Sequence, residues 1–386
     1  MRFAEALAEP GLRAIAEVKR RSPSAGDLRP DADPARLAAG FAQAGAAAVS
    51  VLVDERFGGT IGDLVTARAS TEAPLLAKGF FSTEAQLREL RESGADAVLL
   101  ILSDLDDATA ARLLAYAGEL GMDALVEAHT ADELQRAMGL DAPVVGVNAR
   151  DLSTFRIDRA QQLALVSRAA DGDRIVIAES GVTTRAQGAA AELAGADAIL
   201  VGSALMRAPD PEAKLRELLS RPLVKECGLT RQEDVDVAVE AGADLLGFIL
   251  VDKSPRRAEA VLDVPETALS VAVFVEETRK TPADLVQFYP DDGGSVRGRE
   301  ALLLRDGREV ARVLDQPWQR HDPLHWRDAA AANGRIVLAG GLGPGNVRAA
   351  IEAVQPWAVD AASSLEREPG VKDHGKVRAY VEAARS

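Results

Sequence analysis

The chain has 386 residues, 47% of them hydrophobic and 27% charged, which is the composition of a globular protein of two or three domains. Its formal net charge of −15 argues against nonspecific binding to nucleic acid or to an anionic membrane. No apolar run approaches the roughly 20 residues of a membrane span, and the first residues lack the apolar segment of a signal peptide.

The numbers of cysteines and histidines indicate the cell compartment and argue against a metal site. Cys227 is the single cysteine, so the chain cannot form an internal disulfide, which fits a reducing cytoplasm. The 4 histidines do not cluster at metal-ligand spacing, so we expect no zinc site. An acidic protein can still bind phosphate locally, through backbone amides and a few cations.

Short apolar or β-branched runs alternate with stretches of helical period along the first half of the chain. The predicted strands are residues 14–18, 47–53, 74–78, 97–102, 122–127, 144–148, 175–179 and 198–202. Stretches such as 33–45 and 83–94 are long enough for the crossover helix that a parallel pair of strands needs. Eight strands with intervening helices predict a (β/α)8 barrel.

A weak internal repeat supports this array and extends beyond it. Residues 44–52, 93–101, 194–202 and 241–249 each end a predicted helix on glycine and enter a strand. Because the fourth copy follows the first eight strands, a second array begins near residue 222. Its strand-like runs are residues 223–227, 245–251, 270–275, 336–341 and 357–363.

The second array is less regular than the first. Between residues 276 and 330 we place no crossover helices, and residues 288–315 favour a loop followed by a hairpin around 305–308. We therefore predict an α/β protein of two consecutive (β/α)8 barrels, residues 1–220 and 221–386. The second barrel is expected to be shortened or remodelled around 276–330.

Polar residues gather at the predicted carboxyl ends of the strands, where such barrels form their active sites. In the first array they are Glu17, Lys19, Ser22, Lys78, Glu127, Asn148, Arg150, Glu179, Ser180, Gly181, Gly202 and Ser203. Singly, each has a simpler interpretation: Glu17 and Lys19 face the same side of a strand and can form a structural ion pair, and Lys78 can be solvated. Together, two lysines and three glutamates at one mouth favour acid–base chemistry on a polar, phosphate-bearing substrate.

Seven segments of the first half form a distinctive series: "IAEVKRRSPSAG", "VSVLVDERFGG", "LLAKGF", "LVEAHT", "VGVNARDLSTF", "IAESGV" and "ADAILVGSALMR". Through them, residues 4 to 215 resemble indole-3-glycerol phosphate synthase, the ring-closing enzyme of tryptophan synthesis. The resemblance implies ring closure of a carboxyphenylamino-deoxyribulose phosphate with loss of CO₂ and water. It implies neither a cofactor nor a metal.

The resemblance also implies residue roles. Lys78 would protonate the substrate carbonyl, and Glu127 would assist proton transfer during dehydration. Lys19 would bind the substrate carboxylate or shuttle protons, while Glu17 would hold Lys19 and a substrate hydroxyl. Asn148, Arg150, Glu179 and Ser180 would bind the substrate, and Ser22, Gly181, Gly202 and Ser203 would bind its phosphate.

This half departs from the family pattern at two places. Gly79 follows Lys78 where the family usually has an aspartate, so we expect a less constrained lysine. The first predicted strand begins at residue 14, whereas the family carries a longer N-terminal extension that closes over the substrate. We therefore expect a weaker grip on the substrate.

The second half carries "VKECGLTRQEDVDVAVEAGADLLGFILVDKSPR", "VAVFV", "IVLAGGLGPGNV" and "PGVKDHGKVRAYV". Through them, residues 223–384 resemble phosphoribosylanthranilate isomerase, the preceding enzyme, which is known fused to the synthase in this order. The implied reaction is an Amadori rearrangement, in which a base moves a proton from C2 while an acid opens the ribose ring. The implied roles are base for Cys227, acid for Asp315, carboxylate binding for Arg256, and phosphate binding for Gly340, Gly341 and Ser363.

Several interpretations stay open. "QPWQRHDP" follows Asp315 where the family has a glycine-rich loop, and Ser364 occupies a glycine position. The main hypothesis is that the chain is a monomeric, cytoplasmic, bifunctional enzyme with small phosphosugar-anthranilate substrates. The alternative is a synthase whose second half is an inactive structural or docking module. A different phosphosugar isomerase would want aspartate at the first strand end, and the many strand-end charges disfavour a non-enzymatic binding protein.

Overall fold

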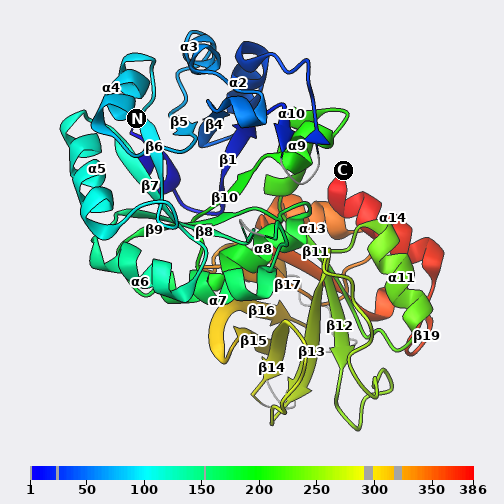
Figure 1. Cartoon of the computed structure of the whole chain (residues 1–386). Coiled ribbons are helices and arrows are strands. Elements are labelled where there is room, and N and C mark those ends of the chain that lie inside the picture. The colour runs from blue at the N-terminus through cyan, green and yellow to red at the C-terminus, as the bar shows by residue number, and fades with distance from the viewer. Residues whose placement is uncertain (1, 23–25, 152–153, 291–298, 317–323) are drawn as a thin grey trace. The chain divides into compact units, whose positions relative to one another are not determined.

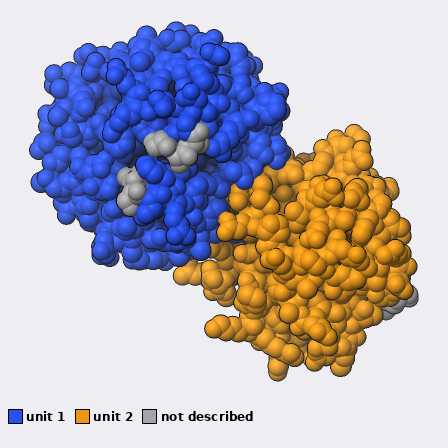
Figure 2. Space-filling model, turned by 45° about the vertical axis from the view of Figure 1, so that its right-hand side comes forward, with its two compact units in different colours: residues 1–183, 188–219 blue, residues 184–187, 220–386 orange. Residues whose placement is uncertain are grey.

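The computed structural model of the chain describes residues 2–22, 26–151, 154–290, 299–316 and 324–386 (Figure 1). They form two compact units, one of residues 1–183 with 188–219 and one of residues 184–187 with 220–386 (Figure 2). Within the described chain, each unit contains a closed barrel of eight strands. The predicted fold class, two consecutive barrels with a remodelled second one, is therefore confirmed.

The first barrel contains all eight strands predicted for it. They are β1 (Arg13–Val18), β4 (Ala48–Leu52), β5 (Leu75–Lys78), β6 (Ala97–Ile101), β7 (Asp123–Ala128), β8 (Val144–Asn148), β9 (Ile175–Glu179) and β10 (Ala198–Val201). Neighbouring strands are parallel, and β1 pairs with both β4 and β10, which closes the barrel. The short strands β2 (Arg21–Ser22) and β3 (Gly26–Asp27) form a separate antiparallel pair after β1.

Helices connect these strands as the crossover argument requires. They are α2 (Pro34–Gln43), α3 (Ile61–Arg68), α4 (Glu84–Glu92), α5 (Asp107–Glu119), α6 (Ala131–Gly139), α7 (Arg159–Ala169), α8 (Arg185–Ala194), α9 (Ser203–Arg207) and α10 (Pro211–Leu219). Many begin where a short side chain can accept a backbone N–H of the first turn, as Thr83 does for α4 and Asp106 does for α5. Polar residues between the apolar runs thus stabilise the first turns of the helices.

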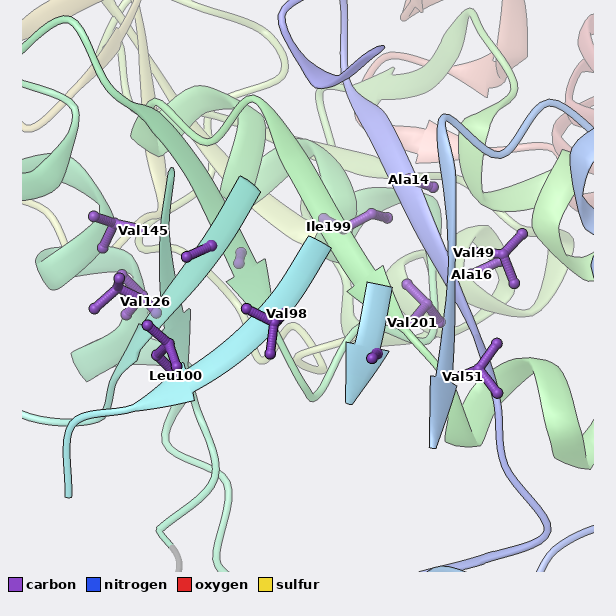
Figure 3. Packing of buried hydrophobic residues seen from close by; sticks show 14 of the residues in the cluster. Ala14, Ala16, Val49, Val51, Val98, Leu100, Val126, Val145, Ile199 and Val201 are labelled. Atoms are coloured by element: carbon purple, nitrogen blue, oxygen red, sulfur yellow. The ribbon is translucent and has the colours of Figure 1, made fainter. Parts of the chain in front are cut away.

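Strand alternation separates an outer from an inner face in the first barrel. Outward residues such as Ala14, Val49 and Val98 pack beneath the helices (Figure 3). The inner cluster contains Ile15, Leu76, Leu125 and Ile177, together with Phe3 and Leu7 of helix α1 (Phe3–Leu7). Asp123, the first residue of β7, accepts the N–H of Ala4, so α1 covers the amino-terminal end of the barrel. The carboxyl end is left for polar side chains.

The repeat found in the sequence has a physical basis. Its glycines, Gly45, Gly94, Gly195 and Gly242, all have left-handed backbone φ angles, of 97°, 101°, 104° and 95°. Residues other than glycine rarely adopt this backbone conformation, which ends a helix and turns the chain towards the next strand. Three copies then place an aspartate that accepts a backbone N–H from the neighbouring strand: Asp96 from Leu75, Asp197 from Val176 and Asp244 from Val224.

The second barrel keeps eight strands with fewer helices. The strands are β11 (Leu223–Cys227), β12 (Leu245–Ile249), β13 (Leu269–Val275), β14 (Leu285–Tyr289), β15 (Arg299–Arg305), β16 (Arg308–Asp315), β17 (Ile336–Leu338) and β18 (Ala358–Ala361). The described helices of this unit are α11 (Gln232–Ala241), α12 (His325–Ala330), α13 (Val347–Val354) and α14 (His374–Arg385). A small antiparallel pair, β19 (Glu366–Glu368) and β20 (Val371–Lys372), precedes α14.

The remodelled region differs from the expectation in one strand. Strand β15 is antiparallel to both β14 and β16, and the predicted hairpin turn is present, with left-handed φ angles of 50° at Asp306 and 78° at Gly307. The expectation of a loop at 288–289 is wrong, because these residues end β14. That strand is short and carries the buried polar residue Gln287, so its sequence lacks a continuous apolar signal.

A pair of substitutions tests the role of the repeat glycines. Gly45→Ala should lower the free energy of unfolding by about 1–2 kcal/mol, because its Cβ meets no atom within 4 Å and only the left-handed backbone is penalised. Gly195→Ala should cost more, since its Cβ would lie 2.6 Å from the Cβ of Ala170. Urea unfolding of both variants measures the difference, and equal losses would contradict the packing argument.

Candidate active sites

Four charged side chains of the first barrel converge at its carboxyl end. Glu17, Lys78, Glu127 and Glu179 each lie two residues after an inward apolar residue of β1, β5, β7 or β9, so the pleat directs them inward. The three glutamates are at most 3% exposed. Unpaired carboxylates at that depth would strongly destabilise the fold. The carboxyl end of the barrel, called the first mouth below, therefore needs cations close to these glutamates.

Lys78 is the common partner of the three glutamates. Its Nζ donates a 2.7 Å hydrogen bond to Glu179 Oε2 and lies 3.6 Å from Glu17 Oε2 and 3.8 Å from Glu127 Oε2. Lys19 Nζ lies 2.5 Å from the other oxygen of Glu17. The structure thus brings all five residues of the predicted acid–base cluster together.

The protonation of this cluster follows from the distances. Burial alone would lower the pKa of Lys78, but the carboxylates of Glu179, Glu17 and Glu127 raise it above its ordinary value, so Lys78 is an ammonium ion. Burial alone would raise the pKa of Glu17, but Lys19 and Lys78 hold it below the ordinary value. The pair noted in the sequence therefore points into the barrel as an ion pair.

Glu127 and Glu179 differ in proton affinity. Burial would raise the pKa of Glu127, but the hydrogen-bonding imidazole of His129 and the charge of Lys78 lower it to about 2. Burial and the nearby carboxylate of Glu127 raise the pKa of Glu179 to about 8. Glu127 is thus the weaker and Glu179 the stronger proton acceptor of the two, and such a difference between neighbouring carboxyl groups is what general acid–base catalysis uses.

Two glycines leave the space that the carboxylates occupy. A Cβ on Gly146 would lie 2.1 Å from Glu179 Oε1, and a Cβ on Gly202 would lie 2.2 Å from Glu17 Oε1. Gly202 was predicted as a phosphate ligand, so this steric role is an addition. Gly146 was missed, although a glycine inside a β-strand signals a close approach by a neighbour.

The remaining predicted residues lie at or after the carboxyl ends of β1, β8, β9 and β10. Asn148 ends β8 and accepts the N–H of Arg150 at 3.0 Å, while Arg150 donates to the carbonyl of Phe155 at 3.2 Å. Ser180 and Gly181 turn after β9 with left-handed φ angles of 69° and 77°. Ser203 opens α9 directly after Gly202, and the buried hydroxyl of Ser22 has no partner among the described residues.

The departure at Gly79 has a steric counterpart. A Cβ at this position would lie 2.7 Å from Cζ of Phe81, so the Phe81 ring occupies the space beside the glycine. Lys78 is 15% exposed and contacts three carboxylates without a neighbouring aspartate. The structure therefore does not support the expectation of a less constrained lysine.

The second barrel has its own buried polar cluster. Lys225 on β11 donates a 2.6 Å hydrogen bond to Asp360 on β18, and both point inward with Cys227. Burial raises the pKa of the Cys227 thiol, and the positive charge of Lys225 works in the opposite direction. A Cβ on Gly247 would lie 2.7 Å from the sulfur of Cys227, so this glycine gives the thiol its space.

Asp315, the predicted acid, ends β16 and contacts a tyrosine that sequence reasoning missed. Tyr289 Oη donates to Asp315 Oδ2 at 3.0 Å and accepts from the amide of Gln287 at 2.9 Å. Gln316 N–H donates to the other oxygen of Asp315 at 2.7 Å. The segment that stands in place of the glycine-rich loop, residues 316–323, lies outside the described residues after Gln316.

The predicted ligand groups of the second barrel are in adjoining loops. Arg256 Nε lies 2.9 Å from both oxygens of Glu366, and its Cδ lies 3.1 Å from where a Cβ on Gly228 would be, next to Cys227. Gly340 and Gly341 follow β17 with left-handed φ angles of 93° and 70°. Ser363 begins a short 3-10 helix (Ser363–Leu365), in which the Ser364 hydroxyl donates to the carbonyl of Leu342.

The family model for indole-3-glycerol phosphate synthase matches residues 1–218, more than half of the chain. The chain belongs to the indole-3-glycerol phosphate synthase family. A second family model, for N-(5'phosphoribosyl)anthranilate isomerase, matches residues 324–383. Within the described residues, no helix is long and apolar enough to cross a membrane.

Named relatives agree with this membership. The chain is 49% identical over 210 residues to the indole-3-glycerol phosphate synthase of Micrococcus luteus, covering 53% of this chain and 77% of that protein. It is 48% identical to indole-3-glycerol phosphate synthase 2 of Streptomyces coelicolor, covering 56% and 84%. It is 32% identical to the multifunctional tryptophan biosynthesis protein of Schizosaccharomyces pombe, covering 99% of this chain but only 61% of that longer protein.

A double-mutant cycle tests the packing beside the lysine of this family member. Gly79→Ala should lower the free energy of unfolding by about 1–3 kcal/mol, because the new methyl group overlaps the Phe81 ring. In a Phe81→Ala background the same substitution should cost much less. Gly62→Ala in α3 is the control, since its Cβ would meet only Thr60 Oγ1 at 3.5 Å. An equal cost of Gly79→Ala in both backgrounds would contradict the overlap.

Proposed function

We propose that this chain catalyses two consecutive steps of tryptophan biosynthesis. The second unit would convert phosphoribosylanthranilate to carboxyphenylamino-deoxyribulose phosphate, and the first would close that product into indole-3-glycerol phosphate. The cluster of Lys78 with Glu17, Glu127 and Glu179 at one barrel mouth carries the proposal. The functional boundary would lie between residues 220 and 221, the substrates would be small phosphosugars, and the enzyme would work as a cytoplasmic monomer without a cofactor.

The synthase reaction needs the two kinds of group that the first mouth contains. A carbon–carbon bond forms to the substrate carbonyl, whose oxygen takes a proton from the Lys78 ammonium. The ring carboxylate leaves as CO₂, and the new hydroxyl leaves as water after a second proton arrives. Glu127, a carboxylate near neutral pH, accepts the one proton released from carbon, so each turnover takes up one proton.

Glu179 suits the reloading of Lys78 in this scheme. Its 2.7 Å hydrogen bond to Lys78 and its raised pKa of about 8 mean that it can carry a proton beside the lysine at neutral pH. Lys19 and Arg150 are proposed to bind the substrate carboxylate. Ser22, Gly181, Gly202 and Ser203 are proposed to bind the phosphate, and Asn148 and Ser180 other groups of the substrate.

The isomerase reaction would use the cluster of the second barrel. Cys227 would take the proton from C2, and Lys225 would favour the thiolate that this step requires. Asp315 would give a proton to the ring oxygen, with Tyr289 holding its carboxyl group. Arg256 would bind the anthranilate carboxylate, and Gly340, Gly341 and Ser363 the phosphate.

Lys78→Ala tests the synthase assignment. Formation of indole-3-glycerol phosphate, followed by fluorescence, should fall by about 10²–10⁴ in turnover, which is the usual contribution of a positioned general acid. The isomerase activity of the same protein, followed as loss of phosphoribosylanthranilate fluorescence, should be unchanged. Full synthase activity in this variant would rule out the role of Lys78.

A second pair of variants tests the isomerase assignment. Cys227→Ala should abolish loss of phosphoribosylanthranilate, and Tyr289→Phe should reduce it by about tenfold, since it removes one hydrogen bond to Asp315. Tyr380→Phe is the matched control, because the buried Tyr380 hydroxyl has no partner among the described residues. A wild-type chain with synthase activity alone would instead support the alternative, in which the second unit is a structural or docking module.

A further inference from the structure

His129 lies outside the set of residues given a role in the proposed synthase reaction, yet it touches one of them. It follows β7 directly after Ala128, two residues beyond Glu127, and its side chain is 8% exposed. Its Nε2 lies 3.2 Å from Glu127 Oε1. The imidazole ring of His129 can change the proton affinity or the position of the Glu127 carboxyl group. It can do so through the charge, the hydrogen bonds or the packing of the ring.

A second carboxylate holds the other side of this ring. His129 Nδ1 lies 3.2 Å from Glu133 Oε2 on helix α6, and the backbone N–H of His129 donates to the same oxygen at 2.6 Å. Glu133 itself is fixed, because its backbone N–H donates to the Thr130 side chain that caps α6. The ring therefore has one carboxylate within 3.2 Å of each nitrogen, an arrangement that attracts the positively charged imidazolium.

The charged groups around the ring favour that cation. Burial would lower the pKa of His129, but Glu127 and Glu133 raise it to about 9. Asp151 and Asp158 line the same hollow of about 250 Å³ as His129 and Glu133, which adds negative charge on the outer side. Lys78, Glu17 and Glu179 face it only across Glu127.

We propose that His129 is a positioning residue of the synthase site: held by Glu133, its imidazolium keeps Glu127 ionised and leaves the shared proton on Glu179. Glu127 and Glu179 both face Lys78 Nζ, and repulsion between two buried carboxylates at one site favours a proton on one of them. Lys78 is closer to Glu179, at 2.7 Å, than to Glu127, at 3.8 Å, so lysine alone would place the proton on Glu127. The imidazolium reverses that preference.

His129 acts in this way as a fixed charge and not as a proton carrier. The carboxylates of Glu127 and Glu133 hold the proton on the ring, because they raise the pKa of His129 to about 9. The inference deepens the proposed function and rests on it for its catalytic meaning. The ionisation of Glu127 itself is a property of the free protein.

Substitutions that separate charge from packing test the inference. His129→Gln, which removes the charge, should shift the acidic limb of the kcat–pH profile upwards by about 1–3 pH units, because an opposite charge at this distance lowers a carboxyl pKa by that much. Glu133→Gln should shift it less and in the same direction. His129→Lys, which keeps a positive charge, should return the limb towards its wild-type position.

A merely structural role would lower the amount of folded protein without moving the limb. An unmoved limb in His129→Gln, or in Glu133→Gln if the former does not fold, would overturn the inference. Titration of the Glu127 carboxyl carbon by NMR in the substrate-free chain gives the same answer without activity. If the wild type makes no indole-3-glycerol phosphate, the proposed function fails, while an upward-shifted Glu127 pKa in His129→Gln would still support the electrostatic role.

Discussion

The contact between the Lys78 ammonium and three buried glutamates is the interaction on which the first barrel mouth depends. Without a cation at that point, Glu17, Glu127 and Glu179 would be carboxyl groups withdrawn from water with too little compensation, and they would bind protons or disrupt the fold. The barrel makes the contact possible because parallel strands end at one rim and the pleat turns every second residue inward. Gly146 and Gly202 then leave the volume that the carboxylates fill. The lysine, the three glutamates and the two glycines therefore determine both the packing of this end of the barrel and the charges available for catalysis.

The second barrel also contains buried charged side chains that need partners, and here they lie on β11 and β18. Lys225 is 1% exposed and is paired with Asp360 at 2.6 Å, and Cys227 shares its strand face. A further buried lysine, Lys372, donates to the carbonyls of Cys227 and Ala362 and so ties the end of β11 to the segment after β18. The pairing of β11 with β18 closes this barrel, and the antiparallel hairpin of β15 and β16 places Asp315 at the end of a strand without a helix between the two.

Much of this organisation could be predicted from the sequence, and the failures have physical causes. The eight strands of the first barrel and the inward pair of Glu17 and Lys19 follow from local apolar periodicity, which is strong there. Strand β14 was missed because its inward Gln287 interrupts the apolar pattern. Tyr289 was missed because it contacts Asp315 on another strand, and spacing along the chain does not reveal such a contact. His129 was missed although it lies two residues after Glu127, because the turn of its ring towards Glu127 and Glu133 follows from the chain path after β7 and not from a sequence pattern. The filling of space at Gly79 by Phe81 likewise depends on a ring position that no pattern encodes.

Neutron diffraction from crystals of the chain at neutral pH would locate the protons on Lys78 and on the three glutamates of the first mouth. We expect a fully protonated Lys78 ammonium, one proton on Glu179, and carboxylates without protons at Glu17 and Glu127. A neutral Lys78, or a proton on Glu127 with Glu179 ionised, would contradict this expectation. A neutral Lys78 would mean that the three glutamates do not hold the lysine as a cation. A proton on Glu127 would mean that His129 does not outweigh the closer contact between Lys78 and Glu179.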